Sequence, residues 1–156
     1  MLQETAASVA GVNREDVMSM QVICPVFVTD NIRRTLEFYT QVLGFKYADH
    51  TDSIEKFATI YRDAIEIIIV EKKQGEVESN HRRYGNGEDA YICPDTIAGV
   101  DALYNEFVQK GVKIIAPPEL KPYGCYEFRL EDIDGRQIGI GRVKDRKRYF
   151  SHSDYE

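Results

Sequence analysis

One sequence pattern occurs twice in this chain, and it constrains the fold more than any other feature. Asp30 aligns with Asp95 at an offset of 65 residues (95 − 30), and the same offset aligns Tyr39 with Tyr104. Each copy then reaches a glycine at the end of its apolar segment. A repeat of this length indicates two copies of one supersecondary unit that share a core.

Each copy has the pattern of a strand, a helix and three further strands. Residues 21–28 are rich in β-branched and apolar residues, which predicts a strand. A helix follows, with Asp30 as the expected N-cap, an apolar stripe from Ile32 to Leu43 and Gly44 at its end. The remaining first-copy strands are expected at 45–51, 54–62 and 64–72, and the second copy at 88–93, helix 97–110, 112–116, 123–131 and 136–142.

The predicted fold class is therefore α+β, with two tandem βαβββ modules. Residues 21–142 are expected to form a single domain, with modules 21–73 and 88–142 joined by a polar linker, 74–87. Residues 1–20 form a peripheral segment outside the repeat, and residues 143–156 form a charged tail. A chain of 156 residues is long enough to bury a core without disulfides or a structural metal.

Charge and composition argue against several classes of function. The net charge of −6 disfavours nucleic acid as a partner, and the one basic cluster, 142–148, lies beside a polar tail that favours a solvated role. No apolar run is long enough to span a membrane, and the first residues lack a basic secretory start, so we expect a cytoplasmic protein. Cys24, Cys93 and Cys125 have the spacing of neither a disulfide framework nor a zinc motif.

Several stretches carry a resemblance to a known family. They are Pro25 to Asp30 continuing to Tyr39, Leu43-Gly44-Phe45, Val100 to Tyr104, and Tyr123 to Phe128 continuing through Asp132-Ile133-Asp134-Gly135. In order and spacing they resemble the glyoxalase/bleomycin-resistance/dioxygenase family, the vicinal oxygen chelate superfamily, and especially its bleomycin-resistance-like branch. The resemblance implies that the paired βαβββ modules form a cup-shaped mixed sheet, that clefts form between the subunits of a homodimer, and that a ligand is held in the cup.

The resemblance also implies four cup-facing positions that hold a divalent metal in the enzymes of the superfamily. They correspond here to Ile23, Ile68, Glu88 and Gly139. Only Glu88 can donate a side-chain oxygen, and a shift of one residue along each strand does not restore a ligand set. The sequence therefore predicts no superfamily-type metal centre and no cofactor.

Alternation along the strands predicts which side chains face the cup. The expected set is mostly apolar with a few polar groups, as in pockets for small molecules, and Gly139 and Gly141 leave room on its floor. The alternative is a cup filled by its own side chains or by a partner subunit. The candidate ligand-binding residues are Phe27, Glu66, Glu88, Ile92, Tyr123, Glu127, Arg129 and Gln137.

Each polar candidate also has a structural interpretation. Glu127 and Arg129 share one strand face, where they either pair with each other or serve separately as an anionic and a cationic group. Tyr123 and Tyr126 flank a glycine and either stack on a planar ligand or pack at the rim. The basic patch beginning at His81 forms either a lid or a solvated part of the linker.

The leading functional hypothesis is a metal-free protein that binds a small organic molecule, with drug sequestration as one candidate role. A second hypothesis is a lyase, isomerase or dioxygenase of the same superfamily that acts on a small carbonyl or aromatic substrate, with Glu127 or Glu88 as general base. A third is a regulatory or interaction module with a filled cup. No catalytic residue is assigned, and neither nucleic acid nor membrane is expected as a partner.

Overall fold

The computed structural model of the chain describes residues 20–48 and 57–150. The predictions for residues 1–19, for strand residues 49–56 and for the last six residues of the tail lie outside the described residues. The first module contains β1 Val26–Thr29, α1 Ile32–Glu37, the π-helical turn η2 Phe38–Val42, β2 Lys46–Tyr47, β3 Phe57–Arg62 and β4 Ile65–Glu71. The second contains β5 Ala90–Ile92, α3 Ile97–Gln109, β6 Lys113–Leu120, β7 Cys125–Glu131 and β8 Gln137–Val143.

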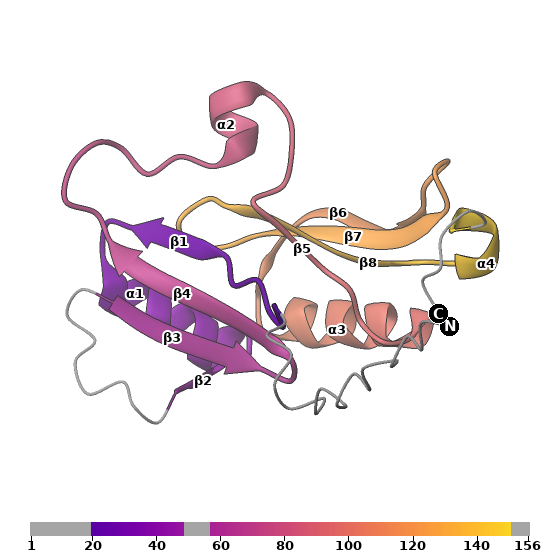
Figure 1. Ribbon diagram of the computed structural model, residues 1–156, viewed down its shortest axis with the longest axis horizontal. Helices are drawn as coiled ribbons and strands as arrows, with labels where there is room; N and C mark the ends of the chain where they lie inside the picture. The colour runs from indigo at the N-terminus through magenta and orange to yellow at the C-terminus, as the bar shows by residue number, and fades with distance from the viewer. Residues whose placement is uncertain (1–19, 49–56, 151–156) are drawn as a thin grey trace, which may run out of the picture.

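Both modules have the predicted βαβββ topology, and each forms its own four-stranded sheet. The strand orders are β1-β4-β3-β2 and β5-β8-β7-β6, so the first strand of each module lies beside the last one. That pair is parallel and the other pairs are antiparallel, which makes both sheets mixed. Helix α1 packs on one face of the first sheet and α3 on one face of the second (Figure 1).

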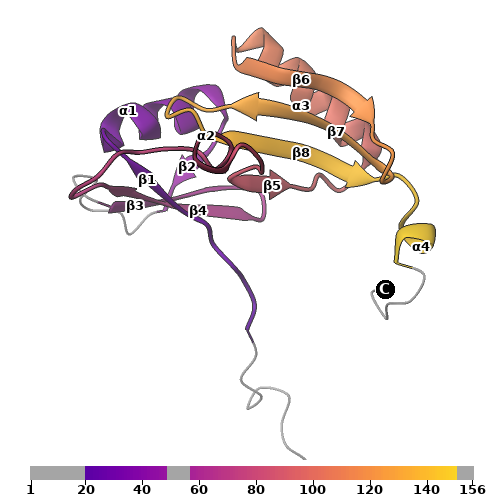
Figure 2. The same ribbon diagram turned by 90° about the horizontal axis from the view of Figure 1, so that it is seen from above.

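Several boundaries differ from the predicted ones for local reasons. The N-caps are Asn31 and Thr96, whose side chains accept backbone N–H groups of Arg34 and Gly99. Asp30, the predicted cap, instead pairs with Lys72 at 2.5 Å. The predicted linker contains a short helix, α2 Asn80–Tyr84, and the predicted tail begins with the end of β8 and another short helix, α4 Arg146–Tyr149. Figure 2 shows α4 beyond the end of β8.

One hydrophobic core is shared by the two modules. It lies between the sheets and their helices, because alternate residues of each strand point toward α1 or α3. Tyr39, Phe128 and Val100 are among its most buried members. Tyr39 makes an edge contact with Phe45, and Phe128 makes one with Tyr104 of α3. We call the opposite side of each sheet, away from α1 or α3, its cup face.

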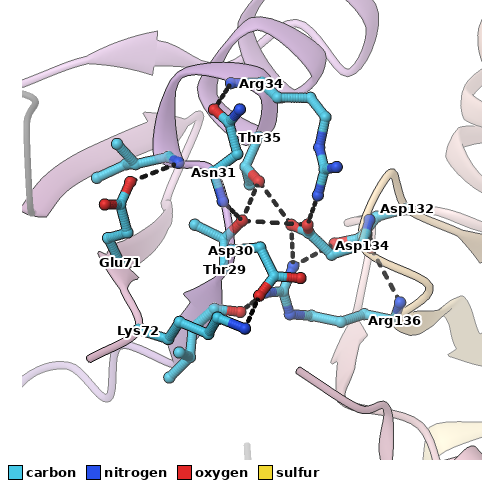
Figure 3. A network of polar contacts seen from close by, with 12 residues as sticks. Thr29, Asp30, Asn31, Arg34, Thr35, Glu71, Lys72, Asp132, Asp134 and Arg136 are labelled. Carbon is cyan, nitrogen blue, oxygen red and sulfur yellow. Dashed lines mark hydrogen bonds and ion pairs between the residues drawn. The ribbon is translucent and has the colours of Figure 1, made fainter. Parts of the chain in front are cut away.

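A buried polar network joins the first module to the β7–β8 turn of the second (Figure 3). Arg136 donates to Asp132 at 2.8 Å and to Asp134 at 2.9 Å, and it also donates to the backbone oxygen of Val28 in β1. The Tyr39 hydroxyl donates to Asp132 at 2.8 Å, across 93 residues of sequence. The Asp-x-Asp-Gly turn therefore holds the two modules together.

Asp134 receives further donors from α1. Thr35 donates its hydroxyl to Asp134 at 2.6 Å, and Arg34 donates a guanidinium N–H at 2.6 Å. Burial opposes ionisation of this carboxyl, but the hydrogen bond from Thr35 and the charge of Arg136 together lower the pKa of Asp134. The network therefore favours a charged Asp134 in the folded protein.

No helix within residues 20–48 and 57–150 is long and apolar enough to cross a membrane.

Candidate ligand-binding site

Strand register determines which side chains reach the cup face. In the second module, Tyr91 of β5 pairs with Gly139, and Glu127 of β7 pairs with Gly141. Ile138 and Ile140, on either side of Gly139, are core residues, so Tyr91, Glu127 and the two glycines share the cup face. Cys125 and Arg129 lie on that face at two-residue intervals from Glu127, as predicted.

Two predicted cup residues lie on the opposite side. Phe27 is buried in the core and its ring contacts Tyr39, with centroids 6.3 Å apart. Ile92 packs against the same core. These two residues are equivalent in the repeat, and the prediction fails at both because it counts strict alternation from positions 23 and 88, whereas the regular strands begin only at Val26 and Ala90.

Tyr91 occupies the space that the two glycines leave. A Cβ added at Gly139 would lie 2.6 Å from Cδ2 of Tyr91, and one added at Gly141 would overlap the Tyr91 hydroxyl. The Tyr91 ring therefore lies across β8, directly over Gly139 and Gly141. Any larger residue at either position would displace the ring. The expectation of open room on the floor is wrong at this point, because Tyr91 fills it.

Tyr91 reaches Glu127 across the glycines and forms the centre of the site. Its hydroxyl donates to Glu127 Oε2 at 2.7 Å, and the Tyr123 hydroxyl donates to Glu127 Oε1. Glu127 is only 5% exposed, and none of the ion pairs among the described residues includes it. A buried carboxylate is thus held by two neutral donors and forms no ion pair within the part of the chain that the structure describes.

The carboxylate affects the groups around it. Burial and then the hydrogen bond to Glu127 raise the pKa of both Tyr91 and Tyr123 above the ordinary tyrosine range. Burial also raises the pKa of the Cys125 thiol, next to Glu127 on the cup face of β7. These groups therefore remain protonated donors at neutral pH.

The other charged candidates form separate contacts. Arg129 pairs with Glu88 at 2.9 Å and not with Glu127, so the two candidates on β7 have different partners. Glu66 lies on the cup face of the first sheet, where Cys24 Sγ donates to it at 3.5 Å. Tyr126 points to the helix side and donates to Asp101 of α3 at 2.7 Å, so of the two predicted aromatic candidates only Tyr123 borders the site.

Gln137 is a polar side chain without a partner. It is buried at the start of β8, on the side of the sheet that carries Gly139. Its Oε1 atom is buried and accepts no hydrogen bond from the described residues. A buried amide oxygen without a donor is destabilising, so this oxygen is an acceptor available to a ligand.

Comparison with known proteins places this geometry in a family. The sequence model of the Glyoxalase/Bleomycin resistance protein/Dioxygenase superfamily matches residues 22–140. The chain belongs to this superfamily. A comparison with curated proteins found no match.

Several solved structures have the same fold as this chain. A glyoxalase/bleomycin resistance protein/dioxygenase from Alicyclobacillus acidocaldarius is 16% identical, with a TM-score of 0.67 over 83% of this chain and 96% of that one. A bleomycin-binding protein from Streptomyces verticillus, complexed with copper(II)-bleomycin, is 21% identical, with a TM-score of 0.59 over 80% and 97%. A protein of unknown function from Agrobacterium tumefaciens is 23% identical, with a TM-score of 0.59 over 82% and 98%.

The residues of this superfamily member do not fit the metal that the superfamily's enzymes use. Ile68 and Gly139 lie on the cup face but have no donor atom, and Ile23 has none either. Within residues 20–48 and 57–150, no group of three His, Cys, Asp or Glu side chains could hold a metal ion. We therefore derive no chemistry through such a metal.

Sequence reasoning missed Tyr91, which is the central aromatic residue of the site. The signal was available in the repeat: Tyr91 and Val26 occupy equivalent positions (91 − 26 = 65), and both glycines that accommodate the ring are visible in the sequence. The prediction missed Tyr91 because the regular strand begins only at Ala90. Strict alternation counted from Glu88 therefore assigns Tyr91 to the wrong face of the sheet.

Proposed function

We propose that this superfamily member binds a small organic molecule that carries a basic nitrogen, at the cup face around Glu127. A more specific version of this proposal is that the protein sequesters a drug. The proposal depends on one observation, the buried Glu127 carboxylate that accepts from Tyr91 and Tyr123 and has no cationic partner among the described residues.

The electrostatics of the site favour a cation. A buried carboxylate without a counter-charge is costly, and a ligand ammonium or guanidinium group would neutralise it. Tyr91 and Tyr123 are partly exposed beside the carboxylate, and their ring faces attract cations. The unpartnered Gln137 oxygen adds an acceptor for a ligand N–H on the same sheet. The bleomycin-binding neighbour supports the proposal at the level of fold.

Binding is favoured over turnover by the state of the two general-base candidates. Glu88 is paired with Arg129, and both oxygens of Glu127 already accept hydrogen bonds from tyrosines. A substrate proton would have to displace one of these partners before it came within hydrogen-bonding reach of either carboxylate. Incubation with methylglyoxal–thiol adducts or catechols, with and without added metal, is therefore expected to give no turnover.

A ligand-dependent melting experiment tests the proposal. Bleomycin, benzylamine and benzyltrimethylammonium are screened for a rise in melting temperature, since a ligand at 100 times its Kd adds about 2.7 kcal/mol of stability. Glu127→Gln keeps the shape of the side chain but removes its charge, so we expect binding to weaken by about tenfold or more. The matched control is Glu119→Gln, because Glu119 lies directly opposite Glu127 on β6 but pairs with Lys121. The proposal fails if no cation raises the melting temperature, or if both variants bind equally well.

We also propose that a second copy of the chain covers the cup face of the first sheet. Val26, Val28, Phe57 and Tyr61 are exposed on that face, and contiguous apolar area of this kind marks contact surfaces. Sedimentation is expected to show a dimer at micromolar concentration. A monomer that is unchanged by Val28→Lys would contradict this assembly.

A further inference from the structure

A pocket lies at the far end of the second module, between the β6–β7 hairpin and α4. Its volume is about 1030 Å³, which is at the upper end of the range for pockets that hold small molecules. Figure 2 shows α4 next to the ends of these strands. The lining residues are Leu120 to Gly124 of the hairpin and Val143 to Tyr149 of β8 and α4.

The lining has a strong positive charge in an acidic protein. Among the described residues it contains Lys121, Lys144 and the run Arg146-Lys147-Arg148, with Asp145 as the one acidic side chain. Lys121 pairs with Glu119 at 2.7 Å. Lys144, Lys147 and the two arginines have no carboxylate partner among the described residues. Like charges gathered around one pocket repel one another, and an anion bound between them relieves the repulsion.

Hydrogen bonds of the backbone hold the segment that carries these cations. Lys144 N–H donates to the Gly124 oxygen at 2.9 Å, which ties the end of β8 to the hairpin. The Asp145 side chain accepts the Arg148 N–H at 3.0 Å and so caps α4. Arg142, the remaining member of the basic cluster, instead donates to the Pro94 oxygen on the other side of the sheet. The pocket cations are therefore a defined subset of the basic segment.

Two aromatic rings line the same pocket. Tyr123 and Tyr149 are 55% and 52% exposed, and Tyr149 lies close to Gly124, where an added Cβ would be 3.9 Å from Cδ2 of its ring. Exposed tyrosine rings beside unpaired cations provide both a stacking surface and a charge for a planar anion. Arg146 adds a planar guanidinium, which suits carboxylate and phosphate groups.

We infer that this pocket is a second binding site, separate from Glu127, for a small aromatic anion that carries a phosphate, sulfonate or carboxylate group. The anionic group binds Lys144, Lys147 and Arg148, and the ring stacks on Tyr149. Tyr123 lies between the two sites, because its ring lines the pocket while its hydroxyl donates to Glu127. Opposite charges are therefore recognised on the two sides of one tyrosine.

Titration of the full chain with phenyl phosphate, followed by calorimetry and amide NMR, tests this inference. We expect saturable binding that weakens with salt and shifts the amide signals of residues 121–124 and 143–149. Lys147→Glu with Arg148→Glu is expected to weaken binding at least tenfold. The control, Arg33→Glu with Lys110→Glu, reverses two equally exposed charges far from the pocket and is expected to leave the Kd unchanged. Tyr149→Ala is expected to weaken phenyl phosphate binding severalfold and to leave that of inorganic phosphate unchanged.

Three results would overturn the inference. One is the same Kd for the unmodified chain and the Lys147→Glu/Arg148→Glu variant. Another is non-saturable signal changes that spread over every basic surface residue. The third is tight binding of a short single-stranded oligonucleotide at these residues without binding of phenyl phosphate, because it would make the surface a nucleic-acid site. Equal melting temperatures of the variants confirm that they are folded.

Discussion

Replacement of Arg136 by Gln tests whether the polar network between the modules is required for stability. The guanidinium group contacts Asp132 and Asp134, and its own side chain is 5% exposed while theirs are 0% and 1% exposed. The substitution leaves two buried carboxylates without their shared cation. It also removes the donor to the Val28 oxygen and the cation over the Phe27 ring, whose centroid is 4.8 Å from the guanidinium carbon.

The expected loss of stability is large for a single substitution. Removal of one partner from a buried ion pair costs about 3–5 kcal/mol. In a domain of about 150 residues each kcal/mol lowers the melting temperature by about 2–4 °C, so we expect a fall of about 6–20 °C. Urea unfolding followed by circular dichroism measures the change in free energy.

Arg34→Gln is the matched control, because Arg34 also pairs with Asp134 but its side chain is 46% exposed. An exposed pair contributes about 0–1 kcal/mol, so this variant should lose little stability. A loss below about 1 kcal/mol for Arg136→Gln, or equal losses for both variants, would refute the argument that burial makes this network strong. Addition of Asp132→Asn to Arg136→Gln should cost less than the sum of the single changes, because the two groups interact.

Three further predictions follow from other contacts. Gly139→Ala places a Cβ 2.6 Å from the Tyr91 ring and should weaken amine binding about five- to tenfold, as measured by calorimetry, whereas Tyr91→Phe, which removes only the hydroxyl, should have a smaller effect. The lowered pKa of Asp134 gives stability that is present above its unfolded pKa of about 3.9 and is lost as pH falls through the folded pKa, so Asp134→Asn should flatten the acid dependence of unfolding. The pKa values of Tyr39, Tyr91 and Tyr123 are raised, which gives stability that is present below about pH 10 and is lost as pH rises through the folded pKa values. In an absorbance titration of the folded protein, fewer than all ten tyrosines should therefore ionise near pH 10.

The repeat was sufficient to predict the architecture from sequence. Equivalent residues at a constant offset identify equivalent strands and helices without any knowledge of long-range contacts. The helix predicted at 97–110 is α3 Ile97–Gln109, and the last strand predicted at 136–142 is β8 Gln137–Val143. Apolar periodicity and glycine position are local signals, and they are strong in both copies.

The site was less predictable, because it depends on contacts that local patterns do not encode. Glu127, Arg129 and Glu88 were found by alternation, but their pairing was not, since Arg129 pairs with Glu88, which lies just before β5 and not on β7. The Asp-x-Asp-Gly turn was visible as a motif, yet its function as a link to Tyr39 depends on a contact across 93 residues. Phe27 and Ile92 were misplaced because alternation cannot be counted across irregular backbone.

The two modules have the same topology, but the first module has larger residues at the positions equivalent to Gly139 and Gly141. The 71-residue offset places Ile68 where the second module has Gly139 (139 − 71), and Val70 where it has Gly141, while Val26 replaces Tyr91. An aromatic ring could not lie across β4 as it does across β8. The cup face of the first sheet thus presents exposed apolar side chains, whereas that of the second carries the Tyr91 ring and the buried Glu127 carboxylate. We therefore expect substitutions on the cup face of the first sheet to change assembly, and those on the cup face of the second to change which ligands bind.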